Sequence, residues 1–137
     1  MTRPTPIDEE VFFDGRSLIS ETDLKGVITF VNRKFVEMSA YPKDESIGQP
    51  HSLLRHPDMP KAAFEGMWKT IQAGNIWEGY VKNLRKDGKF YWVIVNIVPK
   101  KDDNGEVIGY IASRKVPDKH QKDAIILQYR EMLSKEK

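Results

Sequence analysis

The sequence predicts an α+β fold: a five-stranded antiparallel sheet that carries short helices and one longer helix on one face, with helical extensions at the N- and C-terminal ends. Two β-branched and aromatic runs lie before residue 32 and three more lie after residue 76, and this composition is typical of strands. Strands in two groups with helices between them favour an antiparallel sheet with its helices on one side. The chain has 137 residues, enough for one hydrophobic core but too few for two.

The first elements are expected to be a hairpin and three short helical segments. Residues 17–21 and 27–31 have the composition of strands and are separated by a turn. Asn32 is suited to cap the short helix that follows, because its side chain can accept a hydrogen bond from a free amide of the first turn. Single helical turns are predicted at residues 44–48 and 51–55.

The longer helix and three strands follow. Residues 60–73 repeat their large apolar side chains at helical spacing. The strands 77–85 and 89–99 flank Asp87-Gly88, a pair that strongly favours a hairpin turn. A last strand is predicted at residues 107–116. The apolar positions of the helix are Phe64, Met67, Trp68 and Ile71.

The two ends are expected to lie outside the sheet. Residues 1–16 are interpreted as an N-terminal cap, residues 17–116 as the central domain, and residues 117–137 as a C-terminal amphipathic helix. The apolar stripe of that helix is Ile125, Tyr129, Met132 and Leu133.

Composition excludes several classes of function. The 22 Lys and Arg residues are interspersed with 20 Asp and Glu residues, so there is no basic surface for nucleic acid. The absence of cysteine excludes disulfides, thiolate metal sites and cysteine nucleophiles. No apolar run approaches the ~20 residues of a membrane span, so we expect a cytoplasmic protein without direct membrane insertion. No nucleophile and base pair, metal set or nicotinamide fingerprint indicates an enzyme.

The segment 53–61 is the most unusual part of the chain, because it places two prolines, both signs of charge and an imidazole between apolar runs. Such a segment is typical of a loop at a helix entrance that receives a charged group. Arg55 could hold a phosphate in a two-pronged contact, or it could be a surface residue paired with Asp58. Asp58 is expected to cap the helix that follows.

The two histidines of this region are open to more than one interpretation. His56 precedes a proline and is therefore held extended, while His51 lies one helical turn upstream. Without a third ligand at a recognised spacing they do not indicate a metal site, and a haem would need only one of them. Each could equally be a structural or solvated residue.

Trp77 and Asn83 should share one face of a strand, because strand side chains alternate. Trp77 could stack on an aromatic ligand or belong to the core, whereas Trp68 is assigned to the core. A buried amide costs about 1 to 3 kcal/mol when it lacks a partner, so Asn83 is expected to have a hydrogen-bond partner. The next strand should line the same pocket with Val93, Val95 and Ile97.

The motifs as a whole resemble those of a PAS domain over residues 17 to 116. The resemblance is carried by Val31-Asn32-x-x-Phe35-x-x-x-Ser39-Ala40-Tyr41-x-x-x-Glu45-x-Ile47-Gly48, then by Trp77-x-Gly79, Asn83, Lys86-x-Gly88, Tyr91-Trp92, Pro99 and Gly105-x-x-x-Gly109-Tyr110. The sequence departs from the pattern at Ala40, where PAS domains usually have glycine. The resemblance implies a PAS fold with a ligand between sheet and helices.

Within that family, Gln49-Pro50-His51 and the run from Arg55 to Phe64 look like the aerotaxis-receptor type. This resemblance implies an FAD-binding module that senses redox state, oxygen or electron-transport status. The residues that match flavin-holding positions are His51, Arg55, His56, Asp58, Trp77 and Asn83. The alternatives are a PAS domain that binds haem or another small ligand, or one without ligand that mediates protein contacts.

The same resemblance implies signalling partners. Receptors of this type add membrane-anchoring, HAMP and methyl-accepting segments, so the expected partner is a chemotaxis transducer, with membrane association only through that partner. A sensor fragment and a stand-alone protein are both compatible with the sequence. The outward strand positions Trp92, Ile94, Asn96 and Val98, together with the C-terminal helix, are the expected docking surface and could equally form a homodimer.

Overall fold

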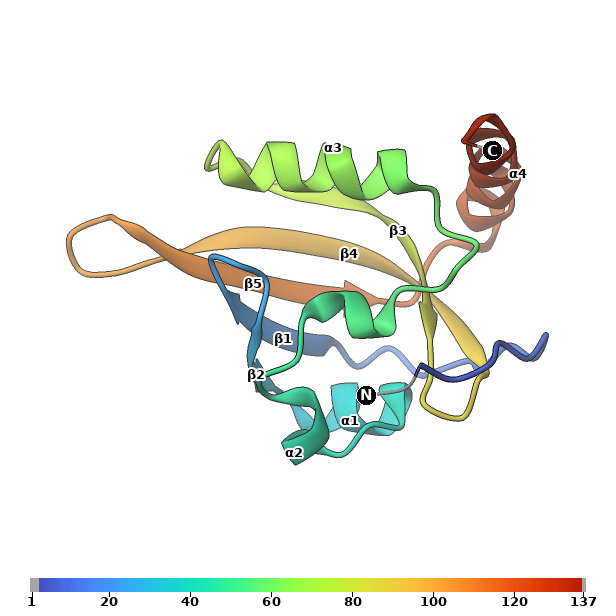
Figure 1. The fold of residues 1–137 in the computed structure, drawn as a ribbon, viewed down its shortest axis with the longest axis horizontal. Helices are drawn as coiled ribbons and strands as arrows, with labels where there is room; N and C mark the ends of the chain where they lie inside the picture. Colours follow the sequence, from blue (N-terminus) through green and yellow to red (C-terminus); the bar gives the residue numbers. More distant parts are fainter. Residues whose placement is uncertain (1–2, 137) are drawn as a thin grey trace.

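The computed structural model describes residues 3–136, and it has one antiparallel sheet with the strand order β2-β1-β5-β4-β3. The elements in chain order are β1 Leu18–Asp23, β2 Ile28–Val31, α1 Arg33–Ser39, α2 Lys43–Ser46, the 3-10 helix η1 His51–Leu54, α3 Lys61–Gln72, β3 Trp77–Leu84, β4 Phe90–Lys101, β5 Val107–Lys115 and α4 Lys119–Lys135. The helices from α1 to α3 lie between β2 and β3 in the chain and cover one face of the sheet (Figure 1). The predicted α+β architecture is confirmed.

The first hairpin and helix form as expected, and Asn32 is central to both. Its Oδ1 accepts hydrogen bonds from Phe35 N (2.9 Å), which caps α1, and from Ile19 N (3.1 Å), which ties the cap to β1. Ala40 closes the helix in the left-handed conformation, with φ 65°. Glycine adopts that conformation without steric penalty, so the backbone at Ala40 keeps a shape that glycine would favour.

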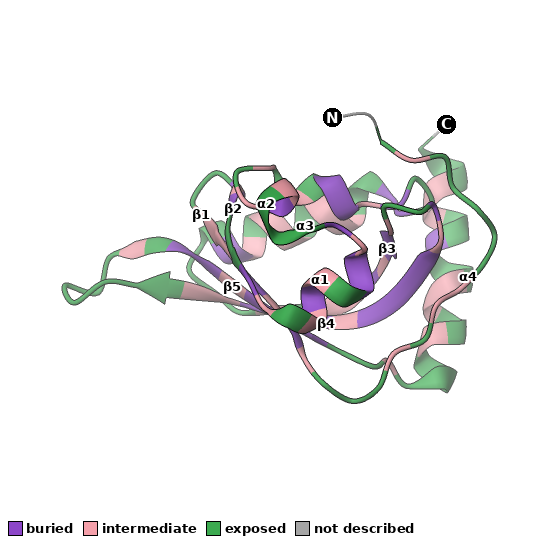
Figure 2. Cartoon of the chain, turned by 90° about the horizontal axis from the view of Figure 1, so that it is seen from below, coloured by how far each residue is buried: buried purple, intermediate pink, exposed green. Residues whose placement is uncertain are grey.

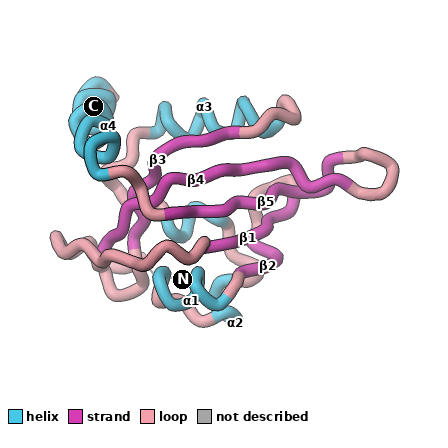
Figure 3. Tube along the Cα trace, turned by 180° about the vertical axis from the view of Figure 1, so that it is seen from behind, coloured by secondary structure: helices cyan, strands magenta, loops and turns pink. Residues whose placement is uncertain are grey.

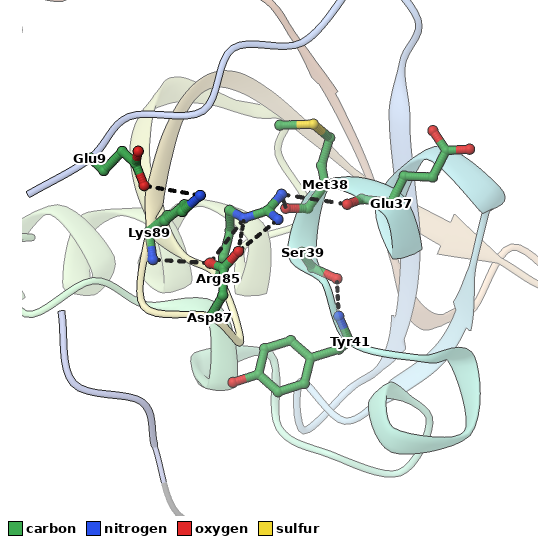
Figure 4. Close-up of polar contacts among 8 residues, drawn as sticks. All are labelled: Glu9, Glu37, Met38, Ser39, Tyr41, Arg85, Asp87 and Lys89. Atoms are coloured by element: carbon green, nitrogen blue, oxygen red, sulfur yellow. Dashed lines mark hydrogen bonds and ion pairs between the residues drawn. The ribbon is translucent and has the colours of Figure 1, made fainter. Parts of the chain in front are cut away.

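The turn between β3 and β4 joins three parts of the molecule (Figure 4). Arg85 donates to the Met38 carbonyl at the end of α1 (2.7 Å) and pairs with Asp87 inside the turn (2.9 Å). Lys89 pairs with Glu9 of the N-terminal segment (2.9 Å). The helical layer and the N-terminal segment are therefore both fastened to this hairpin.

The predicted N-terminal helical extension is wrong, because residues 3–17 contain no helix. Their backbone is hydrogen-bonded to the start of β4 instead: Val11 N donates to Phe90 O (2.8 Å) and Phe90 N donates to Glu9 O (3.1 Å). Pro4 and Pro6 also remove donors that a helix would need after its first turn.

The C-terminal helix α4 packs on the sheet face opposite to α3. The ring of Tyr129 stacks on Trp92, with centroids 6.2 Å apart, and its hydroxyl donates to the Tyr80 carbonyl (2.7 Å). Trp92 is thus covered by the chain itself, so its assignment to an open docking surface is wrong. Figure 3 shows α4 at the end of the molecule opposite to the β4–β5 turn.

The hydrophobic core follows β4, whose first half is buried (Figure 2). A second cluster forms where α1 and η1 meet the first hairpin, and it consists of Ile28, Val31, Phe35, Tyr41, Leu53 and Leu54. Between residues 3 and 136, no helix has the combination of length and apolar composition that would let it cross a membrane.

Candidate functional site

A cavity of about 680 Å³ lies between α3 and the inner face of the sheet. Its walls come from α3, from the segment 50–55 and from β3, β4 and β5. The volume falls within the roughly 300 to 1,000 Å³ of small-molecule sites. This is the space in which the sequence predicts a ligand.

Two tryptophans form part of the wall. Trp68 projects from α3 and meets Tyr110 edge to face, with ring centroids 6.0 Å apart. Trp77 lies across the backbone of Gly79, where an added Cβ would be 2.5 Å from the indole. The strand therefore needs glycine at this position to hold Trp77 along the wall. Trp68, which the sequence assigns to the core, is also a wall residue.

Asn83 is the polar group of β3 on this wall. It is 3% exposed, and its side chain interacts with the buried Tyr91 hydroxyl. Within residues 3–136, however, its Nδ2 makes no hydrogen bond of normal geometry. Its backbone is bridged to that of Arg55, which brings these two predicted site residues together. Val95 and Ile97 of β4 line the cavity as predicted, whereas Val93 is fully buried and is not among the wall residues.

Arg114 is a wall residue that the sequence interpretation missed. It is 2% exposed on the inner face of β5, and its guanidinium donates to Ser20 Oγ (2.9 Å), His51 Nε2 (2.6 Å) and Leu18 O (3.4 Å). Burial lowers the pKa of Arg114 to about 10, so the group is still charged at neutral pH. The available signal was its alternation with Tyr110 and Ala112, which line the same cavity.

His51 lines the cavity as predicted, but its ring nitrogen is already in use. Because Arg114 can only donate, His51 Nε2 is the acceptor in their contact. Loss of hydration, followed by the positive charge of Arg114, lowers the pKa of His51 to about 3. His51 is therefore neutral across the physiological range. Among residues 3–136, no three metal-ligating side chains converge on a common point.

Arg55 and Trp77 also line the cavity, whereas His56 and Asp58 do not. The Arg55 guanidinium lies over the Phe64 ring, 4.1 Å from its centroid. Asp58 pairs with Lys82 (2.8 Å), so the alternative in which it is the partner of Arg55 is wrong.

His56 has a structural position. It is 5% exposed, its Nδ1 accepts a hydrogen bond from Asp58 N (3.0 Å), and its ring packs edge-on against Phe90. Burial, with a smaller effect of the Lys82 charge, lowers the pKa of His56 to about 4. The residue shapes the loop that carries Arg55.

The expected capping role of Asp58 is also wrong. The N-cap of α3 is Pro60, which offers no side-chain acceptor. The amides of Lys61 and Ala62 donate instead to the two carboxylate oxygens of Glu136, at 3.0 Å each. The helix entrance does bind an anion, as the sequence indicates, and that anion comes from the end of α4.

Comparison with known proteins identifies the fold family. A family model described as PAS fold matches residues 28–114. Over 101 residues, 74% of this chain and 20% of the relative, the chain is 50% identical to the aerotaxis receptor of Escherichia coli (strain K12). It is 30% identical over 97 residues, 71% of this chain and 20% of the relative, to the nitrogen fixation regulatory protein of Klebsiella pneumoniae. The chain spans about a fifth of the length of these curated relatives.

A solved structure has the same architecture. The light state of the blue-light photoreceptor Aureochrome1 LOV matches with a TM-score of 0.73 over 81% of this chain and 89% of that chain. At 18% sequence identity this likeness shows the fold alone. The PAS-fold match covers more than half of the sequence and coincides with the observed sheet and helical layer, and the chain therefore belongs to the PAS family.

Proposed function

We propose that this chain is a PAS sensor module that binds FAD in the cavity beneath α3 and reports redox state, oxygen or electron-transport status to a chemotaxis or energy-taxis transducer. The observation that carries the proposal is the buried Asn83 amide, which lies on the wall of a ligand-sized cavity and makes no hydrogen bond of normal geometry within residues 3–136. An unpaired buried amide costs about 1 to 3 kcal/mol. A ligand with polar edge atoms would remove that cost.

The residues present fit a flavin. Asn83 and Arg114 supply hydrogen-bond donors for the polar edge of the ring, and Trp77, Trp68 and Val95 supply an apolar and aromatic wall. Arg55 at the rim offers a planar guanidinium suited to a diphosphate. When bound, FAD would supply the ability to gain and lose electrons, a chemistry that protein side chains lack.

His56 and Asp58 contribute to the proposal indirectly. Their mutual contact and the pairing of Asp58 with Lys82 hold the segment that carries Arg55. We assign to His51 the task of orienting Arg114, since their nitrogens are in contact.

The module is proposed to bind and signal and to catalyse no reaction. A cofactor transmits a state only to the extent that the protein binds its two states differently, so the output is a shift of the sheet against a partner. The name of the Escherichia coli relative, an aerotaxis receptor, supports the energy-taxis setting. The proposed partner is a HAMP or methyl-accepting transducer in the cytoplasm, and the alternative partner is a second copy of the chain.

The test is the absorption spectrum of freshly purified protein, followed by denaturation and mass identification of the released compound. We expect a flavin spectrum and one FAD per chain. A haem band, a different released metabolite, or a folded protein that neither contains FAD nor takes it up would overturn the proposal.

A further inference from the structure

The first turn of α3 holds a carboxylate from the far end of the chain. Lys61 N and Ala62 N each donate to one oxygen of Glu136, a residue 75 and 74 positions away, and both distances are 3.0 Å. These two bonds hold the pKa of Glu136 below its usual range. The contact is therefore made by a charged carboxylate at the positive end of a 12-residue helix.

This contact lies beside the rim of the cavity. The amide of Lys61 donates to Glu136, and Lys61 and Arg55 are both residues of the cavity wall. The charges of Lys61 and Arg55 both act on the Glu136 carboxylate, so an anionic ligand group at this rim would be drawn to the place that Glu136 occupies. The amides cannot hold the ligand anion and the Glu136 carboxylate at the same time.

The helix that carries Glu136 also contacts the opposite face of the sheet. Tyr129 stacks on Trp92 and donates to the Tyr80 carbonyl. One element thus extends from the outer face of the sheet to the rim of the cavity. Release of Glu136 would free the last turn of α4 while the Tyr129 contacts keep the rest of the helix in place.

We propose that the anionic group of the cavity ligand and the Glu136 carboxylate compete for the α3 amides, so that loading the cavity releases the last turn of α4. The identity of the ligand rests on the proposed function, in which this group is the diphosphate of FAD. Coupling between two sites is reciprocal. An interaction that holds Glu136 on the α3 amides therefore lowers the affinity for the ligand by the same factor by which the ligand weakens the Glu136 contact.

The test compares FAD with riboflavin, which has the same ring and no phosphate. Hydrogen exchange of residues 131–136 is measured by mass spectrometry in the free protein and with each compound. We expect FAD to raise exchange in this turn severalfold and riboflavin to leave it unchanged, while both protect the cavity walls. Equal exchange in the free and FAD-bound protein would overturn the inference.

The variant E136Q removes the charge and retains the size of the side chain. We expect it to raise hydrogen exchange of the last turn in the free protein. It should also raise the affinity for FAD relative to that for riboflavin about two- to fivefold, which corresponds to the stabilisation that a carboxylate gives at a helix N-terminus. E131Q is the matched control, because Glu131 lies in the same part of α4 and its exposed carboxylate pairs with Lys135 (3.3 Å). An unchanged FAD to riboflavin ratio in E136Q would contradict the competition.

A third arm separates this inference from the proposed function. If neither flavin binds, the proposed function fails, and inorganic pyrophosphate then tests the competition against potassium chloride at equal ionic strength. Pyrophosphate should raise exchange of residues 131–136 in the native protein and have no further effect in E136Q. No response to pyrophosphate in the native protein would then overturn the inference.

Discussion

Polar groups on the deep wall of the cavity and at its rim differ in whether their hydrogen-bonding partners are already in place. On the deep wall, Asn83 Nδ2 makes no hydrogen bond of normal geometry within residues 3–136, and the Arg114 guanidinium donates to uncharged groups of Leu18, Ser20 and His51. At the rim, the Arg55 guanidinium lies over the Phe64 ring, and the amides of α3 hold Glu136. A ligand can form hydrogen bonds with the polar side chains of the deep wall without breaking an existing contact. At the rim, it must displace the Glu136 carboxylate to reach the α3 amides. Binding energy should therefore come from the deep wall, and regulation from the rim.

The largest expected effect is loss of stability in mild acid. His51 and His56 have pKa values of about 3 and 4 in the folded chain, below the ordinary 6.5. The unfolded chain therefore binds protons first, and stability that is present above pH 6.5 falls as the pH drops toward 4. Each histidine contributes about 2.6 kcal/mol, so we expect a loss of roughly 5 kcal/mol between pH 7.5 and 4.5 in urea titrations.

H51Q separates the two histidines, because a glutamine can still accept a hydrogen bond from Arg114 but cannot be protonated. In H51Q, the decrease in the free energy of unfolding between pH 7.5 and 4.5 should be about half that of the native protein, and the remaining decrease is due to His56. A dependence of stability on pH identical to that of the native protein would show that the pKa of His51 is not lowered by its place in the cavity wall.

The second effect is a trade between stability and binding at Asn83. N83L removes an amide that lacks a partner, so the ligand-free protein should gain about 1 to 2 kcal/mol in the free energy of unfolding. Flavin affinity should fall at least about tenfold, because the polar edge of the ring loses its donor. The measurements are urea titration and equilibrium flavin binding.

N96L is the matched control, since Asn96 lies on the same sheet at a position that alternates away from the cavity residues Val95 and Ile97. Its flavin affinity should equal that of the native protein. A loss of stability in N83L would mean that the Asn83 amide is satisfied without a ligand.

A smaller effect is expected at the rim. R55A should lower the affinity for FAD about tenfold and leave the affinity for riboflavin nearly unchanged, because only FAD carries the diphosphate. Folding should change by less than about 1 kcal/mol, the value of an exposed contact between a cation and an aromatic ring. The control is R33A, an exposed arginine on α1. Equal weakening of both flavins would remove the diphosphate role from Arg55.

The smallest effect is expected for D58N. The ion pair with Lys82 is solvent-exposed on the Asp58 side, and such pairs contribute less than about 1 kcal/mol. The melting temperature should move by a few degrees at most, and less at high salt. A large loss of bound flavin without a change in folding would show that Asp58 does contribute to ligand binding.

The fold could be predicted where short-range chemistry decides it. The Asp87-Gly88 turn and the Asn32 cap depend on neighbours within a few residues, and both form as the sequence indicates. The N-terminal segment could not be assigned correctly, because its conformation depends on hydrogen bonds to Phe90, about 80 residues away.

The site was predictable in part for the same reason. Strand alternation correctly places Trp77 and Asn83 on one wall, and it would also have placed Arg114 there. The α3 cap was not predictable, because Glu136 is remote in sequence from the helix it caps. The flavin-binding roles of His51, Arg55, His56, Asp58, Trp77 and Asn83 stay predictions.

The placement of the indoles gives the protein an optical probe of its own. The chain has three tryptophans; Trp68 and Trp77 face the cavity, and Gly79 keeps the second of them against the wall. Trp92 lies on the opposite face beneath Tyr129. Intrinsic emission should therefore be quenched by any near-ultraviolet absorber that enters the cavity, and W92F would remove the background from the far face. Occupancy can then be followed without a label.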